Sequence, residues 1–226
     1  MGGSLAKIKI YQYKIKDAPE FAESAYRKFE SLPLTDEQKI IKISVISTLA
    51  DVYSKLKRNA AEIEKREQAV TESEKIFSDK TDENIIESKY KLAAAFKDAE
   101  KNNRALEIYE EIYNTLKPLN NERTIDAAAY YANALYHVGR YNDALQLREK
   151  IVDFYRETND IENLRFELHN FRYVLERFSS QSISPYSYRR VHVASTLSPE
   201  GFSLLDTFLL KRKEVTSVHA DIIKMI

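Results

Sequence analysis

Apolar residues recur at every third or fourth position through most of this chain, which is the spacing of one face of an α-helix. The stripe is unbroken near residues 161–178, where it consists of Ile161, Leu164, Leu168, Phe171, Leu175 and Phe178. Polar, charged segments separate such stripes, and only four glycines and five prolines are available for turns. The pattern therefore predicts an all-α protein built from successive amphipathic helices.

The pattern of large and small residues repeats after about forty positions. Residues 89–116 and 128–155 align so that Ala93 matches Ala132 and Ala105 matches Ala144. Ile10 and Ala50 continue the same series toward the N-terminus. A repeat of this length predicts a solenoid, in which each helical unit buries its apolar face against its neighbours. Such an array presents an extended surface, which favours binding over catalysis.

Residues 139–145, with the sequence GRYNDAL, resemble the turn of a tetratricopeptide repeat (TPR). The unit length resembles the longer variety found in kinesin light chains. This resemblance implies pairs of antiparallel helices, A and B, stacked into a right-handed superhelix. It also implies a concave groove, lined by A helices, that receives an extended peptide or a partner's helix.

The repeat divides the chain into three parts. We expect a degenerate N-terminal repeat at 1–32, TPR-like repeats at 33–178, and an irregular loop with C-terminal capping helices at 179–226. The first repeat would place Ile10 and Tyr13 on its A helix, and Ala22, Tyr26 and Phe29 on its B helix. The loop would begin at Ser179, and the capping helix would span residues 199–212. The abrupt ends suggest a piece of a longer protein.

Local signals place the helix ends. Thr35 or Asp36 is suited to cap a helix N-terminus. Gly139 is suited to the left-handed conformation that ends an A helix, and Asn102 or Asn103 would fill this role one unit earlier. Glu62 occupies a position that is usually small.

The residues of the A helices that would face the groove follow from the register of the buried positions. They are Ser44, Ser47, Thr48 and Asp51; Tyr90, Lys91, Ala94 and Lys97; Tyr130, Asn133, Tyr136 and His137; and Arg165, Phe166, His169, Arg172 and Tyr173. The strongest candidates for binding a peptide are Lys91, Lys97, Tyr130, Asn133, Tyr136, His137, Arg165, His169 and Arg172. Their cationic and aromatic character favours an acidic or aromatic partner segment.

Each candidate also has a purely structural interpretation. The lysines and arginines are also consistent with a solvated helix face, the tyrosines with packing between repeats, and the histidines with ordinary surface positions. In chaperone-binding members of the family, a set of Lys and Asn side chains holds a terminal carboxylate. Asn133 matches one such position, but Ala129 and Lys91 do not match the others, which argues against that activity.

Composition excludes several other functions. The 35 basic and 35 acidic residues balance, which gives no support for nucleic-acid binding. There is no cysteine, no apolar run of membrane-spanning length and no signal-peptide pattern, so we expect a cytoplasmic protein. No phosphate loop, metal-binding helix motif or nucleophile motif occurs, and the four histidines lack metal-ligand spacing. We therefore expect no enzyme, no cofactor and no metal.

Two alternative functions stay open at this stage. One is a homo-oligomerisation or structural subunit, favoured by the apolar C-terminal helix. The other is a ligand-sensing domain of a larger signalling or regulatory protein. An enzyme with its site within residues 179–198 is a more remote alternative.

Overall fold

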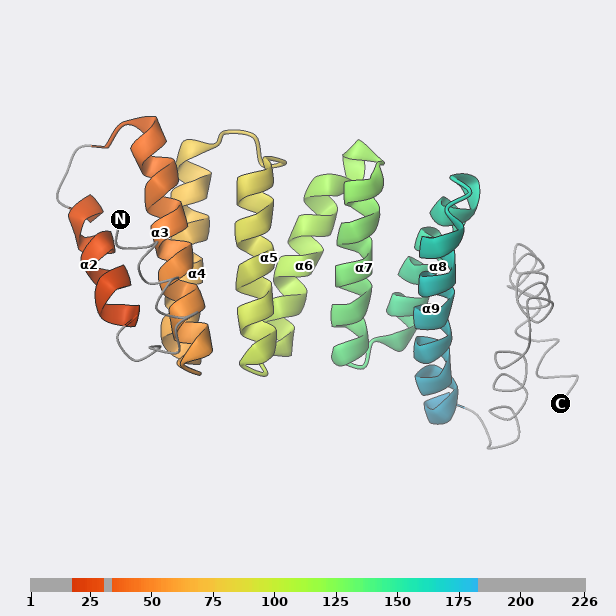
Figure 1. Ribbon diagram of the computed structural model, residues 1–226. Helices are drawn as coiled ribbons and strands as arrows, with labels where there is room; N and C mark the ends of the chain where they lie inside the picture. The colour runs from red at the N-terminus through yellow and green to blue at the C-terminus, as the bar shows by residue number, and fades with distance from the viewer. Residues whose placement is uncertain (1–17, 31–33, 183–226) are drawn as a thin grey trace, which may run out of the picture. The chain divides into compact units, whose positions relative to one another are not determined.

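The computed structural model describes residues 18–30 and 34–182, in which eight α-helices follow one another (Figure 1). The helices are α2 (Ala18–Glu30), α3 (Asp36–Lys55), α4 (Asn59–Ile76), α5 (Glu83–Asp98), α6 (Asn102–Leu116), α7 (Glu122–His137), α8 (Tyr141–Glu157) and α9 (Ile161–Ser182), with a short 3-10 helix, η2 (Lys117–Leu119). The all-α class is confirmed. The segments predicted around Ile10 and Tyr13, and the capping segment after residue 182, lie outside the described residues.

Contacts within the chain define two compact units, residues 1–138 and 139–226. In the first unit each helix from α2 to α7 packs against the next in chain order, and in the second α8 packs against α9. Within the first unit α3, α5 and α7 are the A helices, while α2, α4 and α6 are B helices. The helices therefore form sequential hairpins, as the repeat predicts.

Small residues lie where the helices approach closely. Ala50, Ala93 and Ala132, at matching positions of three A helices, are completely buried. Ala105 of α6 and Ala144 of α8 are buried at the corresponding B-helix position. An alanine has too little side chain to separate two helix backbones, so its recurrence sets the packing of each hairpin. In α2, Ala22 and Tyr26 are also buried, as predicted.

The A helices end in similar turns. Lys57, Glu100 and Gly139, each two residues after the last helical residue, have φ of 58°, 59° and 79°. The N–H groups of Arg58 and Lys101 donate to the carbonyls of Tyr53 and Phe96, which closes a Schellman motif.

The left-handed residue of the α5–α6 turn was predicted incorrectly. Glu100 adopts the conformation that the sequence suggested for Asn102 or Asn103. The position after the helix cap is fixed by where α5 ends, and Asn102 already belongs to α6. At the other end of an A helix, Thr35 forms the capping box of α3 with Gln38, which confirms one of the two predicted caps.

Ion pairs connect neighbouring helices at partly or fully buried sites. Lys89 of α5 lies 2.8 Å from Glu74 of α4 and 2.7 Å from Glu111 of α6. Burial lowers the pKa of Lys89, but the two carboxylates outweigh this effect and raise it. Glu62, at its unusual position, is buried 3.6 Å from Arg66, which also binds Asp51 of α3. A paired carboxylate thus replaces the usual small residue.

Helix α9 differs in two respects from the sequence expectation. It continues to Ser182, whereas a loop was predicted from Ser179. Serine and glutamine only slightly disfavour a helix, so the polar composition of 179–182 was not a stop signal. Its buried side includes Glu167 and Val174 in addition to Leu168 and Phe171, whereas Ile161 is exposed.

Candidate functional site

Three tyrosines from consecutive helices meet on the first unit. Tyr90 of α5 and Tyr130 of α7 have ring centroids 4.8 Å apart, and Tyr109 of α6 lies 5.7 Å from Tyr130 in a stacked arrangement. The third pair, Tyr90 and Tyr109, is 6.2 Å apart. We call these three residues the tyrosine platform. Pairs in this distance range attract one another beyond their shared burial, so the platform is a preformed feature.

The platform passes from the interior to the surface. Tyr109 is 6% exposed and Tyr130 is 50% exposed, with Tyr90 between them. Burial raises the pKa of Tyr109 to about 12, with Tyr130 and Asp98 adding to the effect. Burial also raises the pKa of Tyr90, and Asp126 raises it further. The hydroxyls of Tyr90 and Tyr109 therefore stay protonated well above neutral pH. The half-exposed side chain of Tyr130 is available as an aromatic surface.

Two aspartates act electrostatically on this platform, Asp126 on Tyr90 and Asp98 on Tyr109. Asp126 lies one helical turn before Tyr130 on α7, and Asp98 lies two turns after Tyr90 on α5. Burial raises the pKa of Asp126, and the neighbouring Glu122 adds to this rise. The sequence reading missed both aspartates, although the four-residue spacing of Asp126 and Tyr130 was visible. Tyr109 was not among the predicted site residues, although its ring packs against that of Tyr130.

The predicted binding residues of the first unit differ in their exposure and in their contacts with other side chains. Lys91 forms an ion pair of 2.6 Å with Glu87, one turn away on the same helix. Lys97 and Asn133 are exposed. Tyr136 packs edge-on against His137, with ring centroids 5.5 Å apart. Tyr130 is thus the residue that the structure joins to a larger cluster.

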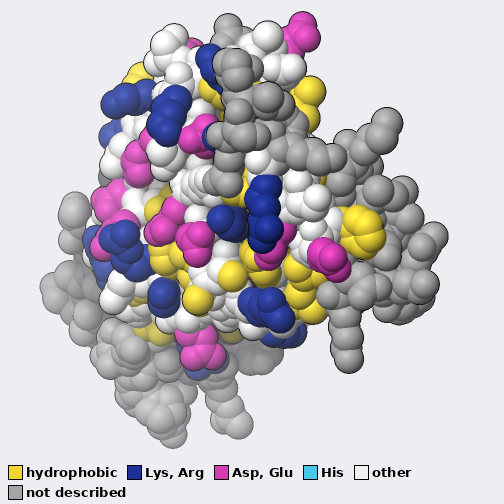
Figure 2. Space-filling view, turned by 90° about the vertical axis from the view of Figure 1, so that its left-hand side faces the viewer, with side chains coloured by type: hydrophobic (Ala, Val, Ile, Leu, Met, Phe, Trp, Pro, Cys, Tyr) yellow, Lys and Arg dark blue, Asp and Glu magenta, His cyan; other side chains and the backbone are white. Residues whose placement is uncertain are grey.

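The A helix α3 contributes less than the sequence suggested. Thr48, predicted to face the groove, is 2% exposed and donates a hydrogen bond to the Ser44 carbonyl. A threonine that satisfies its hydroxyl within its own helix can be buried at low cost. The carboxylate of Asp51 forms an ion pair of 2.6 Å with the guanidinium of Arg66. Figure 2 shows the side of the molecule that carries α2 and α3, where basic and acidic side chains are interspersed.

The remaining candidates lie on α9 in the second unit. Arg165 and His169 are exposed, beside Phe166 at 67% exposure and Tyr173. Arg172 is half-buried and lies 3.8 Å from Glu176. The exposed side of α9 is therefore aromatic and basic, as the register of Leu164 and Leu168 predicted.

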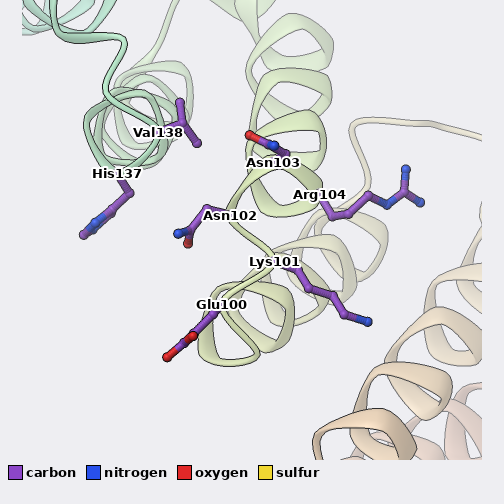
Figure 3. Close-up of a pocket in the computed structure, with 7 residues that line it drawn as sticks. All are labelled: Glu100, Lys101, Asn102, Asn103, Arg104, His137 and Val138. Atoms are coloured by element: carbon purple, nitrogen blue, oxygen red, sulfur yellow. The ribbon is translucent and has the colours of Figure 1, made fainter.

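A shallow polar cavity of about 340 Å³ lies where the α5–α6 turn meets the end of α7 (Figure 3). Its lining consists of Glu100, Lys101, Asn102, Asn103, Arg104, His137 and Val138. The side chains of Lys101 and Arg104 extend away from His137, and both cations lie near the ring of Phe96. The cavity thus contains one predicted residue, His137, without a convergent set of ligands.

Within residues 18–30 and 34–182, no group of His, Asp or Glu side chains is placed to hold a metal ion. None of the helices described has the length and apolar content that crossing a membrane requires.

Comparisons with known proteins identify the fold through structures. No family model matches the chain, and no curated protein matches it. TPR-like repeats of a protein described as a kinesin light chain from Podosopora anserina share 16% identity over 87% of this chain and 96% of theirs, with a TM-score of 0.66. BtubC (BKLC) from P. vanneervenii shares 18% identity over 86% of this chain and 79% of its own, with a TM-score of 0.61.

RapI in its apo form is also similar, at 14% identity and a TM-score of 0.67. The alignment covers 85% of this chain but only 50% of RapI, so the chain spans about half the length of that protein. A Rap protein complexed with competence and sporulation factor aligns with a TM-score of 0.51. Together with the sequential helix hairpins, these likenesses show that the chain has the TPR-like repeat fold.

Proposed function

We propose that this protein is an interaction scaffold that holds an extended peptide or partner segment on the groove side of its A helices. The observation that carries the proposal is the tyrosine platform, in which half-exposed Tyr130 rests on two more deeply buried rings. Tyrosine buries a large area with little loss of side-chain entropy, which is why it dominates many binding hot spots. A ring already fixed by its neighbours reduces the cost of ordering further.

Solved proteins that share the TPR-like repeat fold support a binding role. TPR-like repeats typically act as interaction scaffolds, and a Rap protein of this fold has been solved with competence and sporulation factor. By fold analogy, we propose a non-catalytic role for this chain. We also propose the cytoplasm as the compartment, which is compatible with a chain that has no cysteine and so needs no oxidising environment to form disulfides.

Selection from a displayed random-peptide library on the full chain tests this proposal. Selected peptides should lose binding to Tyr130→Ala by about 2 kcal/mol, the cost typical of an aromatic hot spot. Leu119→Ala, which removes another exposed apolar side chain of the first unit, should bind like the wild type. Peptides that bind the Tyr130 variant and the wild type equally would place binding elsewhere and contradict the proposal.

The exposed side of α9 provides a second proposed contact. Its basic and aromatic residues suit an acidic or aromatic portion of the partner. Arg165→Glu with Arg172→Glu should weaken binding of selected acidic peptides while leaving helicity and the melting temperature nearly unchanged. Loss of helicity would instead show that Arg172 acts through its contact with Glu176.

Self-association is the alternative that a specific observation favours. Phe166 and Tyr173 expose large aromatic surface on α9, and Ile40 and Ile41 do so on α3. Light scattering after size-exclusion chromatography at several protein concentrations distinguishes the two functions. A 26.3 kDa species leaves the tyrosine platform free for a partner, whereas a dimer that persists on dilution would favour a structural subunit.

A further inference from the structure

We infer that the tyrosine platform and its flanking carboxylates bind a cationic side chain, lysine or arginine, of the partner segment. The inference rests on the proposed function, because it names the chemistry of a residue that the proposed site would take. It differs from the sequence expectation of an acidic segment, which was based on lysines and arginines without knowledge of their partners.

The aromatic part of the site is partly exposed. Tyr130 exposes half of its surface while its ring is held by Tyr90 and Tyr109. In the described part of the chain, Lys65, Lys101 and Arg104 lie over the rings of Tyr26 and Phe96, and no cation lies over the tyrosine platform. The face of an aromatic ring attracts a cation, so the half-exposed side chain of Tyr130 suits an ammonium or guanidinium group.

The carboxylates of the site are also uncommitted. Neither Asp98 nor Asp126 forms a side-chain hydrogen bond or ion pair with another residue of the described ranges, 18–30 and 34–182. Both lie within electrostatic range of the platform, Asp126 of Tyr90 and Asp98 of Tyr109. Two negative charges within electrostatic range of a cluster of aromatic rings form the kind of environment that selects a cation.

Basic residues also lie on this side. Lys91 is paired with Glu87 at 2.6 Å, and Arg123 donates a hydrogen bond of 2.7 Å to the Thr81 carbonyl. Arg123 keeps its positive charge, because a carbonyl is neutral, and it acts against the overall rise in the pKa of Tyr90. Lys97 is exposed next to Asp98. Glu122 adds a third negative charge near Asp126. The three carboxylates Asp98, Asp126 and Glu122 outnumber the cations Arg123 and Lys97. The net charge near the platform is therefore negative, and charge complementarity favours a basic segment over an acidic one.

The test is a pair of peptides that are identical except for one central residue, arginine or glutamate. The starting sequence comes from the library selection, and each peptide is titrated into the full chain while amide NMR shifts are followed. The arginine peptide should bind at least about threefold more tightly and shift the amides of Tyr90, Asp126 and Tyr130. Asp98→Asn with Asp126→Asn should weaken its binding by about threefold to tenfold.

A matched variant controls for net charge. Glu37→Gln with Glu67→Gln removes the same two negative charges from exposed positions on α3 and α4. This variant should bind the arginine peptide like the wild type at 150 mM salt, because exposed charges beyond about 8 Å are screened. An equal loss in both double variants would mean that only overall charge matters, and it would overturn the inference.

The other outcomes separate this inference from the proposed function. If the glutamate peptide binds the same amides more tightly, the scaffold function stands and the cationic anchor is wrong. If neither peptide shifts the amides of α5 and α7, the proposed function itself fails. If these amides shift on concentrating the protein alone, a second copy of the chain occupies the platform, and the inference is overturned.

Discussion

Tyr109 shows how one residue connects the core of the first unit to its surface. Its ring lies in the interior, where it supports Tyr130, and its hydroxyl is largely removed from water. Removal from water disfavours the phenolate, which is the main reason why the pKa of Tyr109 is raised to about 12. A residue that serves both packing and the proposed binding surface should therefore leave a signature in stability at alkaline pH.

The first prediction concerns this pH dependence. The neutral form of Tyr109 is favoured in the folded state, so its contribution is complete below pH 10 and is lost as the pH rises through about 12. Tyr109→Phe should remove up to about 2 kcal/mol of the alkaline loss of stability. Urea unfolding at pH 8 and pH 11.5 measures the effect. A wild type and a variant that lose stability in parallel between the two pH values would contradict it.

The turns between paired helices show which backbone conformation ends an A helix and which residues adopt it. Each A helix of the first unit ends with a left-handed residue, and glycine adopts that conformation at least cost. The chain has glycine at position 139 but lysine and glutamate at 57 and 100. An added Cβ at Gly139 would meet no atom within 4 Å, so only backbone strain opposes a substitution there.

The second prediction therefore compares opposite substitutions. Glu100→Gly should stabilise the protein by about 0.5–1 kcal/mol, and Gly139→Ala should destabilise it by about 1 kcal/mol. Glu107→Gly, the same change inside α6, should destabilise by about 1 kcal/mol, because there the backbone is helical. Thermal unfolding gives all three values. Destabilisation by Glu100→Gly would mean that the turn depends on the glutamate side chain rather than on the backbone.

The same turns show how far the sequence predicts the elements. Periodicity and the recurring alanines predicted the helices and their pairing. A helix with one buried face needs apolar residues at every third or fourth position, and a close approach of two backbones needs a small residue. The left-handed residue Glu100 could not be predicted in this way, since glutamate is not a residue type that favours the left-handed conformation. The last residues of α9, 179–182, were wrongly predicted as a loop, because polar composition alone does not end a helix.

The candidate site was less predictable than the helices. Tyr130 could be assigned to the groove from register alone, and the structure gives it an exposed position. Its support by Tyr109 required knowing how α6 and α7 pack. The four-residue spacing of Glu87 and Lys91 is visible in the sequence, but only the structure shows that the two side chains pair. Charge on a helix face is visible in a sequence, but whether that charge is already neutralised depends on three-dimensional contacts.

At the scale of the whole molecule, a repeat array is held together by contacts between neighbours in the chain. Its stability is then a sum of local terms, and one region can unfold while another remains folded. The second unit contains a pair that makes this testable. Arg148 of α8 and Glu167 of α9 lie 2.5 Å apart with both side chains almost completely buried.

Glu167→Ala should destabilise the second unit by about 3–5 kcal/mol, because it leaves the buried guanidinium of Arg148 without its carboxylate. Hydrogen exchange followed by mass spectrometry should show faster exchange in α8 and α9, with α3 to α6 unchanged. Replacing both residues, Arg148→Met with Glu167→Leu, should restore most of the protection, since a well-packed apolar pair avoids the desolvation cost of two charges. If Glu167→Ala instead accelerates exchange equally from α3 to α9, the chain unfolds as one cooperative body, and the local additivity expected of a repeat array does not hold.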